Sequence, residues 1–291
     1  MQRCLLHRSG IKGMRLMLVA CCLVFAWHSL AEAKENSSAS ALQATTSQAA
    51  REEATRAIPL QNIDEKQRRK VHRVLTDCSL YRRMPMGVVP CNPDLFTFLM
   101  QHPEVLVDIW RELGISRVDL QRVGENRFRL TDNAGTTAQL LIVEQKCEPG
   151  AQNRIVMYAE GAYEGKPFKR PVRAQCVLLL RSGSFLETNH EDYVAARLDT
   201  FVRIDRTSIK LFAKAMHPWV GKTADANFID TLTFVSNLSQ AATNNPHQLE
   251  QLVHKLPRIS PQLQREMLSI ATSDRTGNPR NKTRVARARN R

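Results

Sequence analysis

The stretch DYVAARLDTFVRID, residues 192–205, alternates between apolar and polar side chains over most of its length. A period of two is typical of a β-strand with one buried face. One face of this strand would carry Val194, Ala196, Leu198, Val202 and Ile204, and the other Tyr193, Arg197, Asp199 and Arg203. We therefore predict a long strand that packs its apolar face against the protein core.

Five segments before this strand have the same strand-like character, and short turns separate them. The predicted strands are residues 117–123, 126–131, 136–146, 153–164 and 172–182. Turn-forming residues interrupt them at 132–135, 148–150 and 165–167. Short connections favour antiparallel neighbours, because a parallel pair needs a crossover of a dozen or more residues. The sequence thus predicts a six-stranded antiparallel meander.

The residues before the meander show the apolar spacing of helices. We expect one helix at 60–76 and a second over 95–113, with Asn92 or Asp94 as its N-cap and a break at Pro103. An irregular stretch should lie between these helices, because each proline in it removes a backbone donor. The prolines concerned are Pro85, Pro90 and Pro93.

Helical spacing returns after the meander. A short helix is expected at 209–216, followed by a longer one at 224–242 with Thr223 or Asp225 as its N-cap. One more short helix is expected at 247–256. A curved sheet can bury the apolar face of the long helix by closing around it. We therefore predict an α+β fold in which a six-stranded meander wraps a long C-terminal helix and follows an N-terminal helical segment.

The order of these elements, over about residues 95–242, resembles the helix-grip fold of the START and polyketide-cyclase-like superfamily. The segment ANFIDTLTFVSNLSQAA, 226–242, lies where that superfamily has its long helix. The superfamily usually begins with a strand followed by small helices, and here that strand would have to be 117–123. The resemblance implies a cavity between sheet and helix that suits an apolar or amphiphilic ligand.

The chain is also similar to exported bacterial proteins of unknown function. The similarity lies in the segments RPVRAQCVLLLRSG, RLDTFVRID and VGKTADANFIDTLTFVSNLS. It implies no particular activity.

The first 33 residues have the pattern of a secretory signal peptide. A basic head is followed by the uncharged apolar run 16–27 and by the small-residue site Ala31-Glu32-Ala33. The apolar run is shorter than the ~20 residues that a membrane-spanning helix needs. We predict cleavage after Ala33 and a periplasmic or extracellular protein. Lipidation at Cys21 and an uncleaved N-terminal anchor are the alternatives.

Composition divides the remaining chain into three parts. Residues 34–58 are rich in Ser, Ala, Thr and Gln and predict a disordered linker, whose Ala-rich second half could form a weak helix. Residues 59–256 predict a single α+β domain, and residues 257–291 predict a C-terminal extension with a disordered basic tail. The formal net charge of +14 is concentrated in the signal and in the tail. We therefore expect no specific nucleic-acid partner.

Four of the seven cysteines lie beyond the signal: Cys78, Cys91, Cys147 and Cys176. An exported chain can oxidise them, so two disulfides are expected. Of the three possible pairings, Cys78–Cys91 and Cys147–Cys176 are preferred, and buried thiols are the alternative. The absence of a Cys-x-x-Cys spacing argues against a zinc ribbon or a thioredoxin-type site.

The sequence holds no phosphate-binding glycine loop, HExxH helix or GxSxG elbow, and its histidines are scattered. No cofactor or metal is expected. Six residues are candidates for ligand binding: Tyr158, Glu160, Arg197, Asp199, Trp219 and Phe228. The charged pair on one strand face could orient a polar head group, Trp219 could cover the end of the cavity and Phe228 could line it. Cross-strand ion pairs and core packing are the plainer explanations.

These observations predict a non-catalytic, exported monomer that binds an apolar or amphiphilic small molecule. One alternative is a cavity enzyme that uses Tyr158, Glu160, Arg197 and Asp199 for acid–base chemistry. Another is an envelope scaffold that binds an anionic polymer or lipid through the tail Arg280–Arg291.

Overall fold

An antiparallel eight-stranded sheet forms the centre of the computed structural model, which describes residues 42–148, 151–166, 168, 170–205 and 219–273. The strand order is β1-β8-β7-β6-β5-β4-β3, and β2 also pairs with β8. The strands are β1 Leu80–Arg83, β2 Gly87–Pro90, β3 Asp119–Gly124, β4 Arg127–Thr131, β5 Thr136–Lys146, β6 Asn153–Tyr163, β7 Val172–Leu186 and β8 Asp192–Ile204. The six predicted strands correspond to β3–β8, so the antiparallel meander is confirmed.

The strand count of six is too low, because β1 and β2 lie in the stretch that was expected to be irregular. They follow one another along the outer edge of β8, β1 opposite 199–202 and β2 opposite 193–196. A proline is tolerated at a sheet edge, where its missing N–H interrupts no ladder. Pro85 and Pro90 therefore limit these strands in length without preventing them.

The described residues also form seven α-helices and one 3-10 turn. They are α4 Gln48–Ala57, η2 Leu60–Asn62, α5 Glu65–Thr76, α6 Pro93–Gln101, α7 Pro103–Glu112, α9 Trp219–Asn244, α10 Pro246–His254 and α11 Pro261–Thr272. The Asn92 side chain accepts the backbone N–H groups of Asp94 and Leu95 at the start of α6, which confirms this N-cap. Pro103 begins α7 and separates it from α6, as expected.

The N-terminal end of α9 differs from the prediction. Because α9 begins at Trp219, Thr223 and Asp225 lie inside the helix and neither is its N-cap. Asp225 instead accepts a hydrogen bond of 2.8 Å from Nε of Arg82, on the edge strand β1. The helix expected at 209–216 lies outside the described residues, as do the predicted signal peptide and the tail from residue 274.

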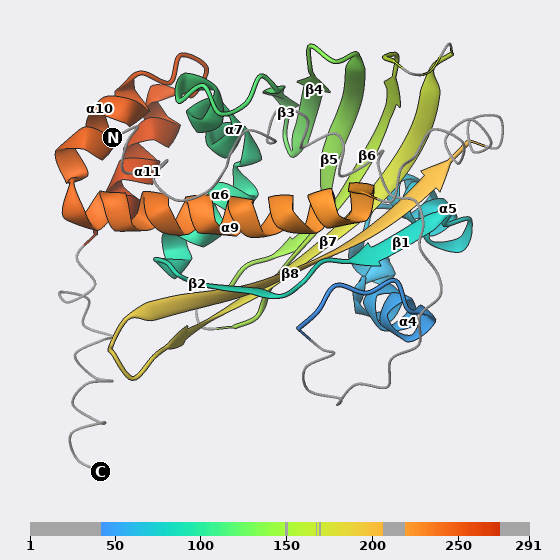
Figure 1. Ribbon diagram of the computed structural model, residues 1–291, viewed down its shortest axis with the longest axis horizontal. Coiled ribbons are helices and arrows are strands. Elements are labelled where there is room, and N and C mark those ends of the chain that lie inside the picture. The colour runs from blue at the N-terminus through green and yellow to red at the C-terminus, as the bar shows by residue number, and fades with distance from the viewer. Residues whose placement is uncertain (1–41, 149–150, 167, 169, 206–218, 274–291) are drawn as a thin grey trace.

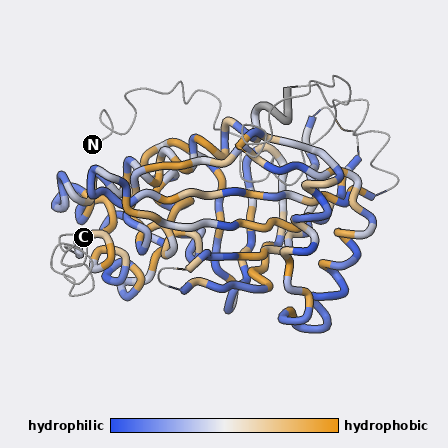
Figure 2. Tube along the Cα trace, turned by 90° about the horizontal axis from the view of Figure 1, so that it is seen from below, coloured by the Kyte–Doolittle hydropathy of each residue, from blue (hydrophilic) through white to orange (hydrophobic). Residues whose placement is uncertain are grey.

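The sheet has a helical layer on each face (Figure 1). The long helix α9 crosses one face together with α6, α7, α10 and α11, and α4 and α5 cover part of the opposite face. Hydrophobic and hydrophilic stretches alternate along these elements, as expected where each has one buried face (Figure 2). We call the two sides the α9 face and the α4 face. Two separate apolar clusters result, the larger on the α9 face.

Both ends of the expected domain extend further than predicted. Residues 48–57, assigned to a disordered linker, form α4, which buries Ala50 and Ala54 against the sheet. Residues 261–272, assigned to the C-terminal extension, form α11, which buries Met267 and Ala271 in the larger cluster. The linker prediction failed for α4 because the only buried residues of this helix are two small alanines, which give the segment little hydrophobic character.

The four cysteines of the described chain form no disulfide. Cys78 lies beside the Val202 end of β8 and Cys91 beside Asp192 at its other end. Those positions are about 33 Å apart at ~3.3 Å per residue, whereas a disulfide needs Cα atoms within about 7 Å. Cys147 and Cys176 are likewise separated by about 20 Å along β6, at ~3.3 Å per residue. Neither preferred pairing is compatible with this fold.

Candidate functional site

A cavity of about 180 Å³ lies on the α9 face, between the sheet and three helices. Its helical wall consists of Leu99, Met100, Pro103, Leu106, Val107, Trp110, Phe228 and Thr231. Its sheet wall consists of Leu120, Leu130, Ala138, Leu140, Ile155, Met157, Ala159, Leu178, Leu180 and Leu198. The sheet residues come from strands β3–β8, because on each strand alternate side chains point toward the helices.

The lining of this cavity is apolar almost throughout. Thr231 has its only hydroxyl, which donates to the backbone oxygen of Asn227 at 2.9 Å and is thereby satisfied. No carboxylate, amine, guanidinium or imidazole lies among the described residues of the wall. Such a wall can exclude water and contact hydrocarbon, but it offers no group that transfers a proton or attacks a substrate.

A polar groove of about 710 Å³ lies beside the cavity. Leu120 of β3 lines both spaces, so one side chain contributes to the wall of each. The groove also contains Glu104 and Asp108, two carboxylates on one side of α7 that are 6% and 5% exposed. One oxygen of each has no hydrogen-bond partner among the described residues.

The two groove carboxylates differ in their electrostatic surroundings. Burial opposes ionisation of Glu104, but its contact with His102 Nδ1 at 3.7 Å and its hydrogen bond from Arg122 Nε at 2.7 Å outweigh burial and hold its pKa below the usual value. Burial raises the pKa of Asp108, and a hydrogen bond from the backbone N–H of Arg258 offsets only part of that effect. Glu104 is thus the stable anion of the pair, and Asp108 is the more readily protonated.

The structure separates the predicted site residues between the two faces of the sheet. Phe228 lines the cavity, as expected. Trp219 is the first residue of α9, and its side chain is outside the described part of the chain. The other four point to the α4 face, so they do not share the cavity with Phe228. They are Tyr158, Glu160, Arg197 and Asp199.

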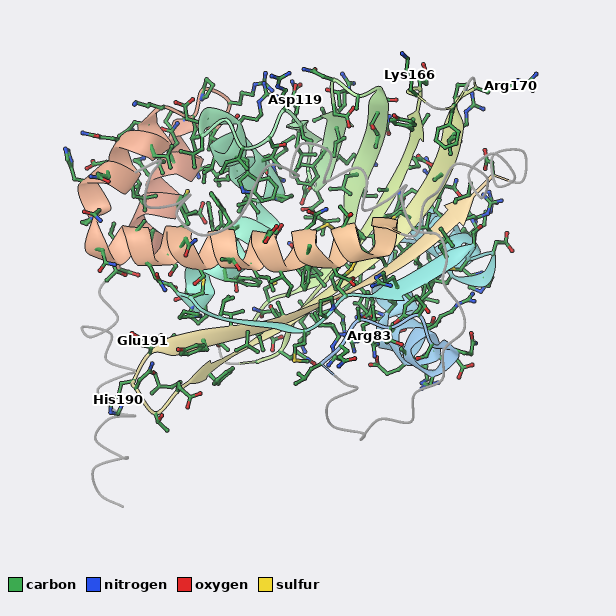
Figure 3. All side chains as sticks on the ribbon, in the orientation of Figure 1. Arg83, Asp119, Lys166, Arg170, His190 and Glu191 are labelled. Carbon is green, nitrogen blue, oxygen red and sulfur yellow. The ribbon has the colours of Figure 1, made fainter. Side chains whose placement is uncertain are left out.

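Asp199 is fully buried at the centre of a charged cluster on the α4 face. Its carboxylate accepts hydrogen bonds from Tyr81 Oη at 2.6 Å, Arg83 Nε at 2.7 Å and Arg181 Nη2 at 2.9 Å. Both arginines also pair with Glu53 of α4. Figure 3 shows Arg83 at the junction of the edge strand and α4. The cluster fastens the helix to the sheet, as charge-assisted hydrogen bonds can.

This cluster shifts the pKa values of its members in the directions its contacts dictate. The hydrogen bond from Arg181 lowers the pKa of Glu53 to about 2, although partial burial opposes the change. Burial, together with the hydrogen bond to Asp199, raises the pKa of Tyr81. Glu53 is therefore ionised and Tyr81 neutral at neutral pH.

Tyr158 and Glu160 form a second polar group on the same face. Tyr158 Oη donates to Glu160 Oε2 at 2.9 Å, and Lys70 Nζ of α5 donates to Glu160 Oε1 at 2.9 Å. Burial and the hydrogen bond to Glu160 raise the pKa of Tyr158. Burial opposes ionisation of Glu160, but the hydrogen bonds from Lys70 and Tyr158 lower its pKa. A neutral phenol and a paired carboxylate are poorly suited to the acid–base chemistry considered for them.

Sequence reasoning missed the residues of α6 and α7 that line the cavity and the groove. A usable signal is present in α7, PEVLVDIWRE, where Glu104 and Asp108 interrupt the apolar run that extends to Trp110. Residues at i and i+4 share a helical face, so this spacing places both carboxylates on one side.

The fold and cavity define an α+β protein with a large antiparallel sheet and an apolar internal space. No protein-family model and no curated protein matches the chain. A crystal structure of a conserved protein from Geobacillus kaustophilus aligns with a TM-score of 0.36 and 12% identity, covering 54% of this chain and 93% of that one.

Two further properties concern the described residues alone. None of their helices combines the length and apolar character that crossing a membrane requires. The same residues contain no group of three or more His, Cys, Asp or Glu side chains that could hold a metal ion.

Proposed function

We propose that this protein binds an apolar or amphiphilic small molecule in the cavity between α9 and the sheet, without transforming it. The observation that carries the proposal is the wall itself, which is apolar apart from the Thr231 hydroxyl and the Trp110 indole N–H and presents no charged group. Binding in such a space is driven by removal of apolar surface from water, at roughly 25 cal/mol per Å².

The volume of the cavity limits what it can hold. An apolar cavity of about 150 Å³ in another protein stays dry and binds benzene. A cavity of about 180 Å³ therefore suits a single ring or a short alkyl segment. The neighbouring groove, which shares Leu120 with the cavity, would place the polar end of an amphiphile near Glu104 and Arg122.

The helix-grip arrangement is part of the same proposal. The position of α9 across a large antiparallel sheet, with the cavity beneath it, supports this interpretation. The basic, apolar and small-residue sequence of the first 33 residues supports export, with cleavage after Ala33 and a periplasmic or extracellular location. We propose that the mature protein acts as a monomer and that its basic tail contacts anionic envelope polymers or lipids.

Native mass spectrometry of protein purified without detergent tests the binding proposal. We expect a bound species that organic extraction removes, and restoration of a complex when benzene or a short alkanol is added to the stripped protein. Stripped protein that binds neither probe, with no increase in thermal stability at saturating probe, would contradict the proposal, because ligand binding to the native state must raise stability.

A further inference from the structure

The β7–β8 hairpin extends past α4, with His190 and Glu191 at its tip (Figure 3). Three pairs of directly opposed residues follow each other along its α4 face: Arg181 with Arg197, Gly183 with Ala195, and Phe185 with Tyr193. Directly opposed residues of an antiparallel pair project to the same side. This part of the α4 face lies beyond Glu53, the residue through which α4 pairs with Arg181.

The middle of this surface is low and its far end is apolar. A Cβ atom on Gly183 would meet nothing within 4 Å, so the space above the residue is open. Phe185 and Tyr193 stack with ring centroids 5.8 Å apart. Phe185 is 42% exposed, and Val88, which lies opposite Ala195 on β2, is 48% exposed. We call the surface formed by Val88, Arg181, Gly183, Phe185, Tyr193, Ala195 and Arg197 the hairpin trough.

The near end of the hairpin trough has an uncompensated positive charge. Arg83 and Arg181 each pair with both Glu53 and Asp199. Arg197 makes no hydrogen bond or ion pair with any residue that the structure describes, although it is only partly exposed. A guanidinium stays charged in proteins, so the three arginines carry one more charge than the two carboxylates balance. An anion is therefore attracted to Arg197.

The negative charges at the tip of the hairpin favour one kind of anion over another. Glu187, Glu191 and Asp192 lie at the end of the hairpin. These carboxylates would be repelled by an anionic membrane surface approaching the exposed apolar residues. A flexible chain that places one carboxylate at Arg197 avoids them.

We propose that the hairpin trough binds an extended acidic peptide segment of a partner protein. Its carboxylate pairs with Arg197, and an apolar side chain four residues away packs on Phe185 and Tyr193. The spacing follows from the strand, since Arg197 and Tyr193 are about 13 Å apart at ~3.3 Å per residue. An extended peptide has the same rise and directs its first and fifth side chains to the same side.

A nuclear magnetic resonance titration tests this proposal. The probe is the acetylated, amidated pentapeptide Asp-Ser-Ala-Ser-Phe, added to the ¹⁵N-labelled chain. We expect saturable shifts of the Gly183 and Ala195 amide signals. Replacing the aspartate of the probe by asparagine, or Arg197→Gln in the protein, should weaken binding about tenfold or more, the loss expected for a hydrogen bond between charged groups.

Two further variants keep the test decisive if Arg197→Gln perturbs the fold. Gly183→Val fills the open space without changing charge and should also weaken binding. Arg173→Gln, on the same face at the other end of β7, should leave binding unchanged. Equal affinity of the aspartate and asparagine probes would overturn the proposal. So would saturation of the same shifts by acetate alone, or by phosphatidylglycerol vesicles in place of the peptide.

Discussion

Gly87 of β2 and Leu232 of α9 are in such close contact that no Cβ atom fits between them. Leu232 is 2% exposed, so neighbouring side chains prevent it from moving aside. This contact sets how closely α9 approaches the outer edge of the sheet, and therefore how the helix is held above the cavity.

Gly87→Ala should therefore lower the free energy of unfolding by about 1–3 kcal/mol, the range for an overpacked core. Gly183→Ala is the matched control, because the added methyl group meets nothing there. At that position, the lower chain entropy of alanine should leave stability equal or slightly higher. Urea unfolding of both variants measures the difference. Equal effects at the two positions would show that α9 is not held by this contact.

Filling the cavity should abolish ligand binding. Ala159 lines the cavity, and Ala159→Leu would place a larger apolar side chain inside it. Ala162→Leu lies on the same strand but projects to the opposite face, so it serves as the control. We expect calorimetry with benzene to detect binding in the wild type and in the control only. Undiminished binding by Ala159→Leu would place the ligand outside the cavity.

Leu120 offers a way to connect the cavity with the groove. Leu120→Ala should cost about 2–5 kcal/mol of stability, as for other buried leucines. It should also let the protein bind longer amphiphiles, because it removes the side chain that lines both spaces. Leu256→Ala is buried in the same cluster but lines neither space, so it should lose stability without changing ligand preference. A titration series of alkanols of increasing length distinguishes the two variants.

The meander could be predicted because strands β3–β8 are long enough to show a period of two. β1 and β2 have four residues each, and prolines beside them mask any pattern. The side of the sheet on which the charged residues lie could also have been inferred. If Leu198 and Val202 face the long helix, then Arg197 and Asp199 must face away from it. The sequence signal for α4 is weak, because its alanines favour a helix but its many charged residues and small apolar surface are also typical of a linker.

The charged cluster around Asp199 should be essential for stability. Asp199→Asn removes a carboxylate charge that Arg83 and Arg181 share in a buried site, and loss of one partner of such a pair costs about 3–5 kcal/mol. Asp205→Asn affects only an exposed contact of 3.8 Å with Arg203 and should change stability by less than about 1 kcal/mol. Denaturant unfolding monitored by circular dichroism checks both values. A small effect of Asp199→Asn would mean that apolar packing alone holds α4.

Glu53 makes part of this stability depend on pH. Its pKa falls from 4.5 to about 2 on folding, so its contribution is complete above about pH 4.5 and is lost as the pH drops toward 2. Glu53→Gln should be less stable than the wild type at neutral pH and should show a shallower loss of stability in that acidic range. Unfolding free energies measured from pH 2 to pH 7 test this. Parallel curves for the two proteins would contradict it.

The groove carboxylates should respond to neutralisation with opposite signs. Burial raises the pKa of Asp108, so its carboxyl binds a proton more readily in the folded state, and its ionisation lowers stability as the pH rises above 3.8. Asp108→Asn should therefore be neutral or stabilising at pH 7. The pKa of Glu104 is lowered, and Glu104→Gln removes the charge that pairs with Arg122 at 2.7 Å, so this variant should be destabilised. Thermal unfolding of both variants at pH 4 and pH 7 separates the two effects. If they shift stability in the same direction at pH 7, the two carboxylates share one electrostatic environment instead of having distinct ones.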